Sequence, residues 1–305
     1  MRAASAARNC PIARQARRVP SGSSDRTVRI AVPDDERSSQ PYRWRMSTLD
    51  RALTLRPDGP ERWLAYADPD HESISAMFGG WTAAIALNAV MRSTTQTASP
   101  SAMTINYIRP ISPGDDLVIT VQHVGGGRSI NHCRADVSMR ANDLMLATAF
   151  VVLTNRRVTD SHLQVTMPTV PDPETLEQIH APGPQGQQTM IRQISGEFAS
   201  GDSTGTLWVR DVSGRALDHL QLAYFADQYA PRSFFWGPGP RPSATITMSV
   251  YFHATDDEIA AVRDDYILNE ATGTRGELST SGQQARLWSR RGALLATTEQ
   301  LCWYR

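Results

Sequence analysis

Two adjacent glycines, Gly79 and Gly80, open an apolar stretch that runs to Met91. If this stretch is a helix, its first backbone N–H groups have no partners within the helix, so they could stabilise negative charge that develops on a substrate oxygen. The missing side chains would also let a bound group come close to the backbone. The alternative is that the glycines only allow the helix to pack tightly against a sheet. Both interpretations predict a helix that begins at this pair.

Hydrolytic chemistry at such a site also needs a group that takes a proton from water, and a carboxylate can do this near neutral pH. Asp227 ends the apolar segment Leu-Ala-Tyr-Phe-Ala-Asp at residues 222–227, which we interpret as part of a second helix. The ordinary alternative is that Asp227 caps its helix or forms an ion pair.

The elements that must position these residues form a pattern that occurs twice. In the first copy, a helix over residues 76–91 is followed by predicted strands at 104–110, 116–123, 129–139 and 144–153. In the second copy, a helix near 220–229 lies among predicted strands at 190–198, 205–211, 245–252, 266–272, 284–289 and 293–303. A helix with a meander of strands, used twice, predicts a duplicated α+β module that could bind a ligand where the two copies meet.

One predicted strand, at residues 245–252, shows a clear alternation of apolar and polar side chains. Ile246, Met248, Val250 and Phe252 occupy every second position. Because successive side chains of a strand point to opposite faces, we expect these four to share one face of the sheet.

Composition excludes several classes of partner. The 305 residues hold 31 Lys and Arg against 31 Asp and Glu, which gives no electrostatic reason to expect nucleic acid or an anionic membrane as the main partner. No apolar run reaches the ~20 residues that a membrane-spanning helix needs. The three cysteines are far apart and show no metal-type spacing, so we expect neither a disulfide framework nor a metal site. Free thiols are typical of a reducing compartment, and we therefore expect a cytoplasmic protein.

Two segments differ in composition from the rest. Residues 1–45 are rich in arginine and poor in acidic residues, which predicts a disordered extension or, alternatively, an organelle transit peptide. Residues 158–187 are rich in proline, which predicts an extended linker. The predicted folded modules are therefore residues 46–157 and 188–305.

The order of several short motifs resembles that of a known family, the double-hotdog acyl-CoA thioesterases of the thioesterase II type. The motifs are Phe78-Gly79-Gly80, Tyr107-Ile108-Arg109-Pro110, Gly127-Arg128-Ser129 and Ala296-Thr297-Thr298-Glu299-Gln300. The resemblance implies an α+β double hotdog, with two antiparallel sheets each wrapped around a central helix. It also implies hydrolysis of an acyl-CoA thioester without a cofactor. Hotdog sheets commonly associate through exposed edges, which predicts a homo-oligomer. Arg128 could contact a phosphate of coenzyme A, and the ordinary alternative is a surface arginine beside a glycine turn.

Members of this family use an Asp, a Thr and a Gln of the second module to position the attacking water. By motif, Gln300 holds the Gln position and Thr272 the Thr position, with Thr274 as a competitor. The resemblance thus implies that Gln300 and Thr272 orient the water, whereas polar residues on predicted strands ordinarily face solvent. Thr247 stands where the family has its Asp, and a threonine cannot act as a general base near neutral pH. Three hypotheses follow: hydrolysis that uses Gly80 as oxyanion donor without this acid, hydrolysis with Asp227 as the replacement carboxylate, or a non-catalytic protein that binds acyl groups or acyl-CoA.

Overall fold

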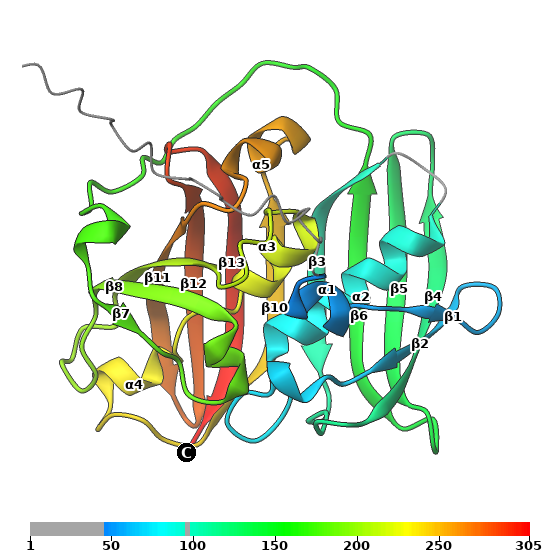
Figure 1. The fold of residues 1–305 in the computed structure, drawn as a ribbon, viewed down its shortest axis with the longest axis horizontal. Coiled ribbons are helices and arrows are strands. Elements are labelled where there is room, and N and C mark those ends of the chain that lie inside the picture. The colour runs from blue at the N-terminus through cyan, green and yellow to red at the C-terminus, as the bar shows by residue number, and fades with distance from the viewer. Residues whose placement is uncertain (1–45, 95–97) are drawn as a thin grey trace, which may run out of the picture. The chain divides into compact units, whose positions relative to one another are not determined.

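The computed structural model describes residues 46–94 and 98–305, and the extension predicted for residues 1–45 lies outside this part. The helices are α1 (Thr48–Ala52), α2 (Gly79–Ser93), α3 (His219–Phe225), α4 (Ser233–Trp236) and α5 (Asp256–Val262) (Figure 1). The strands are β1 (Arg56–Pro57), β2 (Arg62–Tyr66), β3 (Ser99–Tyr107), β4 (Asp116–Gly126), β5 (Ile130–Met139), β6 (Met145–Thr154), β7 (Gln178–Ile179), β8 (Thr189–Ser195), β9 (Gly205–Asp211), β10 (Ser243–Phe252), β11 (Ile267–Glu277), β12 (Thr280–Ser289) and β13 (Leu294–Tyr304). No helix in the described ranges is long and apolar enough to cross a membrane.

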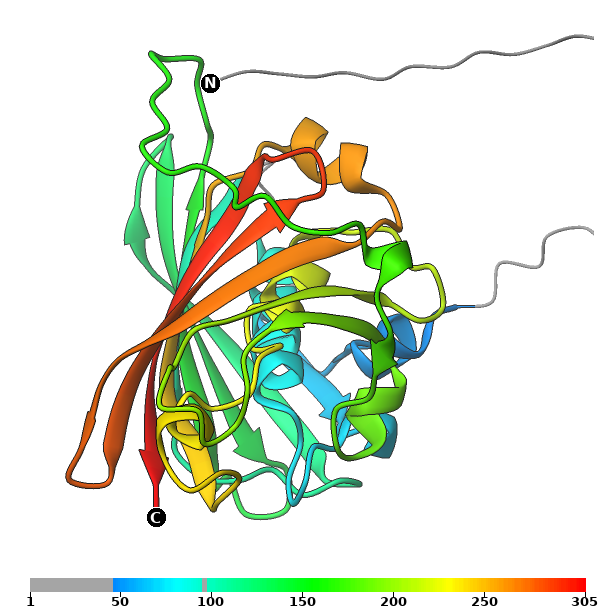
Figure 2. The same cartoon turned by 90° about the vertical axis from the view of Figure 1, so that its left-hand side faces the viewer.

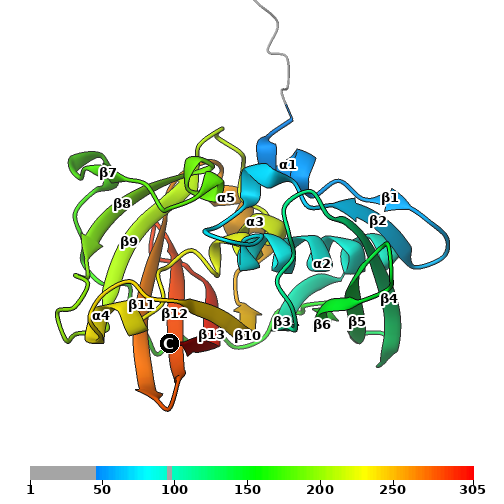
Figure 3. The ribbon, with the colours of Figure 1, turned by 90° about the horizontal axis from the view of Figure 1, so that it is seen from below.

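The strands of the described residues pair in the order β1-β2-β4-β5-β6-β3-β10-β13-β12-β11-β9-β8-β7. The first half of this sheet curves around α2 and the second half around α3, as the view in Figure 3 shows. The halves are hydrogen-bonded to each other where β3 runs antiparallel to β10, with Ile105 opposite Met248. The predicted α+β double hotdog is therefore confirmed, and its two sheets are continuous through the β3–β10 pair.

Helix α2 is the core of the first half. All eleven residues from Gly80 to Val90 are buried, and most of them are apolar. A helix that is apolar on nearly all sides must be enclosed, and α2 packs against β3, β4, β5 and β6 on one side and against α3 on the other. The hydrophobic core of the two halves is consequently one cluster that is continuous through the α2–α3 contact.

Helix α3 is shorter than the sequence predicts. It ends at Phe225, and Asp227 lies in the turn that follows rather than within the helix. The amide of Asn269 on β11 donates to the carbonyl oxygens of Phe225 and Gln228, at 3.4 and 3.5 Å. The Phe225 carbonyl also accepts from the backbone N–H of Gln228 at 3.0 Å, so the amide of Asn269 adds a second contact that ties the turn after α3 to β11.

Strand β10 departs from its predicted alternation. Its register with β13 shifts between Thr245 and Thr247, so one extra residue is inserted there. Met248, Val250 and Phe252 are buried as predicted, but Ile246 is 38% exposed. The prediction for Ile246 was wrong because a β-bulge moves the residues on one side of it to the opposite face, which alternation in the sequence does not reveal.

The proline-rich connection between the halves packs against the outer face of the second half. Val165, Met167 and Val170 contact a cluster formed by Trp208, Leu268, Trp288 and Tyr266. In Figure 2 this connection, in green, runs across the orange and red strands. The indole N–H of Trp208 donates to the carbonyl of Pro171 at 2.9 Å. The connection thus covers apolar residues that would otherwise face solvent. The exact limits of the two modules stay a prediction.

Candidate active site

The N-terminus of α2 is capped by a carboxylate from the other half of the chain. Phe78 precedes the helix and offers no side-chain cap. The backbone N–H of Gly80 instead donates to Oδ2 of Asp227 at 3.0 Å. A carboxylate at this point is stabilised by the free N–H groups and by the positive end of the helix dipole. Two segments that lie 147 residues apart therefore meet at one hydrogen bond.

The second oxygen of Asp227 is held by Gln300. The Nε2 group of Gln300 donates to Oδ1 of Asp227 at 2.8 Å. Gln300 lies on β13, is 2% exposed, and pairs in register with Met248 on β10 and Gln283 on β12. The structure thus brings together Gly80, Asp227 and Gln300, three of the residues that the sequence singles out.

The environment of Asp227 places its titration near neutral pH. Burial raises the pKa of this carboxyl to about 7, and the hydrogen bonds from Gln300 and Gly80 oppose the rise. The residue keeps partial access to solvent. A carboxyl group with this pKa can both take and return a proton under physiological conditions.

The two glycines are needed for close contacts. A Cβ on Gly79 would lie 2.7 Å from Oδ2 of Asp227, and a Cβ on Gly80 would lie 2.3 Å from the carbonyl oxygen of Tyr224. The hydroxyl of Tyr107 donates to the carbonyl of Gly79 at 2.9 Å and so borders the same space. Any larger residue at either position would push against the carboxylate or against α3. Close packing therefore requires both glycines, and a role in chemistry stays a prediction.

Thr272 lies away from this group of residues. It pairs in register with Gln284, and its hydroxyl donates to the carbonyl of Gly273 at 3.4 Å. Asn269, three residues earlier on β11, contacts the segment after α3, so alternation along the strand places Thr272 on the opposite face. Thr274, the competing residue, has its hydroxyl beside Gly282.

Thr247 also lies outside the Asp227 contacts. Its hydroxyl donates to the carbonyl of Ile105 on β3 at 3.0 Å. Because of the bulge in β10, Thr245 and Met248 are the residues of this strand that contact Gln300, through Oγ1 at 3.3 Å from Oε1 and through Sδ at 3.3 Å from Nε2.

Two models of known protein families match the chain, one for each half. Residues 67–154 match the acyl-CoA thioesterase N-terminal domain, and residues 161–304 match the acyl-CoA thioesterase C-terminal domain. The two matches follow each other in order and together cover most of the chain. The chain belongs to the acyl-CoA thioesterase family.

Solved structures place this thioesterase-family chain among double hotdogs. A hotdog-fold protein of unknown function from Alicyclobacillus acidocaldarius is 31% identical, and the match covers 84% of this chain and 97% of that one with a TM-score of 0.80. The TesB protein of Mycobacterium avium subspecies paratuberculosis is 21% identical over 84% of this chain and 98% of its own, with a TM-score of 0.69. The acyl-CoA thioesterase II TesB2 of Mycobacterium marinum is 16% identical over the same shares, with a TM-score of 0.68. No curated protein matches the chain significantly.

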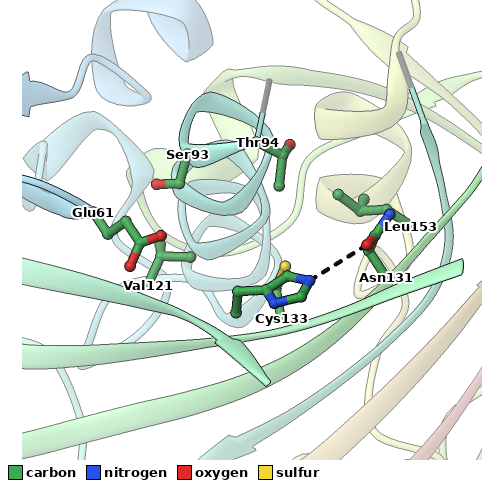
Figure 4. A pocket seen from close by; sticks show the side chains of 8 residues that line it. Glu61, Ser93, Thr94, Val121, Asn131, Cys133 and Leu153 are labelled. Atoms are coloured by element: carbon green, nitrogen blue, oxygen red, sulfur yellow. Dashed lines mark hydrogen bonds between the residues drawn. The ribbon is translucent and has the colours of Figure 1, made fainter. Parts of the chain in front are cut away.

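Two surface hollows of this family member lie apart from Asp227. One, of about 170 Å³, lies in the first half near the C-terminal end of α2 (Figure 4). It is lined by Glu61, Ser93, Thr94, Val121, His123, Asn131, Cys133 and Leu153. Burial raises the pKa of the Cys133 thiol, which keeps the thiol protonated and weakens it as a nucleophile. The other hollow, of about 450 Å³, lies beside α1 and β2.

Arg128 is exposed between β4 and β5, and its carbonyl accepts a hydrogen bond from Asn155 at 2.7 Å. Over the described ranges, no group of three His, Cys, Asp or Glu side chains is arranged to hold a metal ion.

One contact residue of the site was not found from the sequence. Gln283 on β12 donates to Oε1 of Gln300 at 2.8 Å, and it is 1% exposed. The chain reads Gln283-Gln284 at this point, and the alternation of Ala285 and Leu287 with Gln284 and Arg286 places Gln283 on the apolar face of the strand. The sequence therefore carries a signal for Gln283, although the predicted strand begins only at residue 284. The pairing of β12 with β13 then sets Gln283 opposite Gln300.

Proposed function

We propose that this chain hydrolyses an acyl-CoA thioester to the free acid and CoA, with Asp227 as the general base. The observation that carries the proposal is a partly accessible carboxyl of pKa about 7 at the N-terminus of α2. This places a proton acceptor beside the donors that an oxyanion requires. The family match supports the acyl-CoA substrate, and the exposed Arg128 is proposed to meet a CoA phosphate.

In the proposed reaction, Asp227 takes a proton from water while the water oxygen attacks the thioester carbonyl carbon. The π electrons of the carbonyl move to its oxygen, and the resulting oxyanion lies at the positive end of α2. The protonated Asp227 is neutral and therefore binds the Gly80 N–H less strongly, which frees this donor for the oxyanion. When the intermediate collapses, the carbon–sulfur bond breaks and the CoA thiolate takes the proton back from Asp227.

The direct test is release of free thiol from a panel of acyl-CoA esters that differ in chain length. Hydrolysis of at least one ester at pH 8 is the expected result. Absence of thiol release across the panel, with saturable binding of the same esters by calorimetry, would instead identify a non-catalytic acyl-binding protein. Self-association, through edge strands such as β1 and β7, is part of the proposal and is checked by the mass of the particle in solution.

The pH dependence of the reaction follows from the raised pKa of Asp227. Only the ionised carboxylate acts as a base, so kcat/KM should increase about tenfold per pH unit below about pH 7 and level off above it. The folded state holds this proton more tightly than the unfolded chain, in which an aspartic acid has its ordinary pKa of 3.8. Stability should therefore fall as pH rises from about 4 to about 7. A flat profile of kcat/KM between pH 5.5 and 8.5 would exclude Asp227 as the base.

Thr247→Asp tests whether a carboxylate at the family position would improve this protein. We expect no gain in thiol release, because Thr247 lies against the Ile105 carbonyl rather than beside Gln300. The lost hydrogen bond should lower the free energy of unfolding by about 1 kcal/mol. Thr247→Ser keeps the hydroxyl and serves as the control. A gain of tenfold or more in kcat for the Asp variant would show that β10 contributes the base.

A further inference from the structure

Behind Asp227 lies a row of three hydrogen bonds that crosses the interior of the second half. The backbone N–H of Arg232 donates to Oε1 of Gln283 at 2.8 Å, and Nε2 of Gln283 donates to Oε1 of Gln300 at 2.8 Å. Nε2 of Gln300 then donates to Oδ1 of Asp227 at 2.8 Å. We call this row, Arg232–Gln283–Gln300–Asp227, the amide relay.

The direction of the amide relay is set at its first member. A glutamine side chain can usually be turned over, because its oxygen and nitrogen exchange places. A backbone N–H can only donate, however, so Gln283 must present its oxygen to Arg232. Its NH₂ group then points to Gln300, whose own NH₂ group must point to Asp227.

The anchor of the relay is itself held firmly. The guanidinium of Arg232 donates through Nε and Nη2 to the carbonyl of Ala230, at 2.9 and 2.7 Å, and lies 4.0 Å from the ring centre of Phe235. Arg232 is 2% exposed. The backbone N–H at the start of the row therefore has little freedom to move.

Gln300 is fully engaged by its neighbours. Its oxygen accepts from Gln283 and lies 3.3 Å from Oγ1 of Thr245, while its nitrogen donates to Asp227 and lies 3.3 Å from Sδ of Met248. If the amide of Gln300 were turned over, its oxygen would face the carboxylate of Asp227 and its NH₂ group would face the NH₂ group of Gln283. Both contacts are unfavourable in a buried site. Its contacts hold Asp227 and leave no donor that is free to bind water.

We propose that Gln283 is a positioning residue, which acts through Gln300 to hold Asp227 in the orientation that its role as a base requires. The proposal rests on the proposed function for the identity of the base, but the amide relay itself can be tested without substrate. Gln283 belongs to neither of the two hollows, and it reaches Asp227 only through Gln300.

The test compares Gln283→Met with Gln284→Met. Methionine has a similar volume but cannot donate to Gln300, and Gln284 is an exposed neighbour on the other face of β12. The pKa of Asp227 is measured by carboxyl ¹³C NMR on the substrate-free protein. We expect Gln283→Met to raise it by about one unit, because the hydrogen bond to the ionised form loses its orientation, and Gln284→Met to leave it unchanged.

Kinetics supply the second readout. A rise of about one unit in the pKa of Asp227 leaves about a tenth as much ionised carboxylate near pH 6. In Gln283→Met, kcat/KM should therefore fall about tenfold near pH 6 and approach the wild-type value at high pH. KM should change less than kcat. An equal loss at every pH, or an unshifted Asp227 pKa, would overturn the proposal and leave Gln283 a structural residue.

The wild-type protein gives an independent check in case Gln283→Met does not fold. The side-chain amide ¹H and ¹⁵N signals of Gln300 should follow the titration of Asp227, and those of Gln283 should follow to a smaller extent. Signals of Gln300 that ignore this titration would contradict the amide relay. If the relay is observed but no acyl-CoA ester is hydrolysed, the proposed function fails and the relay stands.

Discussion

Asp227→Asn is expected to lower kcat/KM for acyl-CoA hydrolysis by about 10²- to 10⁴-fold, the range typical of a lost general base. Asparagine keeps one oxygen, which can accept from the Gly80 N–H or from the amide of Gln300 but not from both, so the variant should fold with somewhat lower stability. Its amide cannot take a proton from water. The residual rate should also lose its dependence on pH near 7, where burial places the pKa of Asp227.

The measurement is thiol release at pH 6, 7 and 8, with circular dichroism to confirm the fold. Asp257→Asn, which removes an exposed carboxylate in the first turn of α5, is the matched control and should keep wild-type activity. If Asp227→Asn retained more than a tenth of the activity, the base would have to be sought elsewhere. The fall of stability between about pH 4 and 7 should also be smaller in Asp227→Asn, by the linkage of proton binding to folding.

Gly80→Ala should strongly destabilise the protein, although alanine normally favours a helix by about 1 kcal/mol over glycine. Its Cβ would lie 2.3 Å from the Tyr224 carbonyl oxygen and 2.5 Å from the ring of Phe78. The hydroxyl of Tyr224 lies 3.1 Å from Nδ1 of the buried His71, and its ring packs against Phe78. Because neither neighbour can move easily, we expect a net loss of about 1–3 kcal/mol in the free energy of unfolding.

The same substitution should reduce activity, because separating α2 from α3 lengthens the hydrogen bond between Gly80 and Asp227. Urea unfolding and thiol release measure the two effects. Gly127→Ala is the control, since a Cβ there meets nothing within 4 Å, and it should change stability by less than about 0.5 kcal/mol. Equal stability of the two variants would show that α2 and α3 can separate without cost.

The local patterns of this chain are strong enough to predict most of its elements. The apolar run after Gly79 is too long for an ordinary buried strand and is typical of a buried helix, and the strands on both sides of it follow from their alternation and turns. Local patterns do not predict the bulge in β10 or the early end of α3. Both depend on contacts with other strands, namely the register with β13 and the amide of Asn269.

For the candidate active site, the sequence by itself determined the family resemblance, the helix that opens at Gly79-Gly80, and separate candidates in Asp227 and Gln300. Only the tertiary structure decided that Asp227, rather than Thr247, meets Gln300, and that Gln283 lies behind them while Thr272 and Gln284 lie on the opposite face. The physical reason is that a one-residue shift in strand register exchanges the two faces of a strand without any change in its composition. Which polar residue enters the core is therefore settled by pairing between distant strands, and the pKa of Asp227 follows from that enclosure.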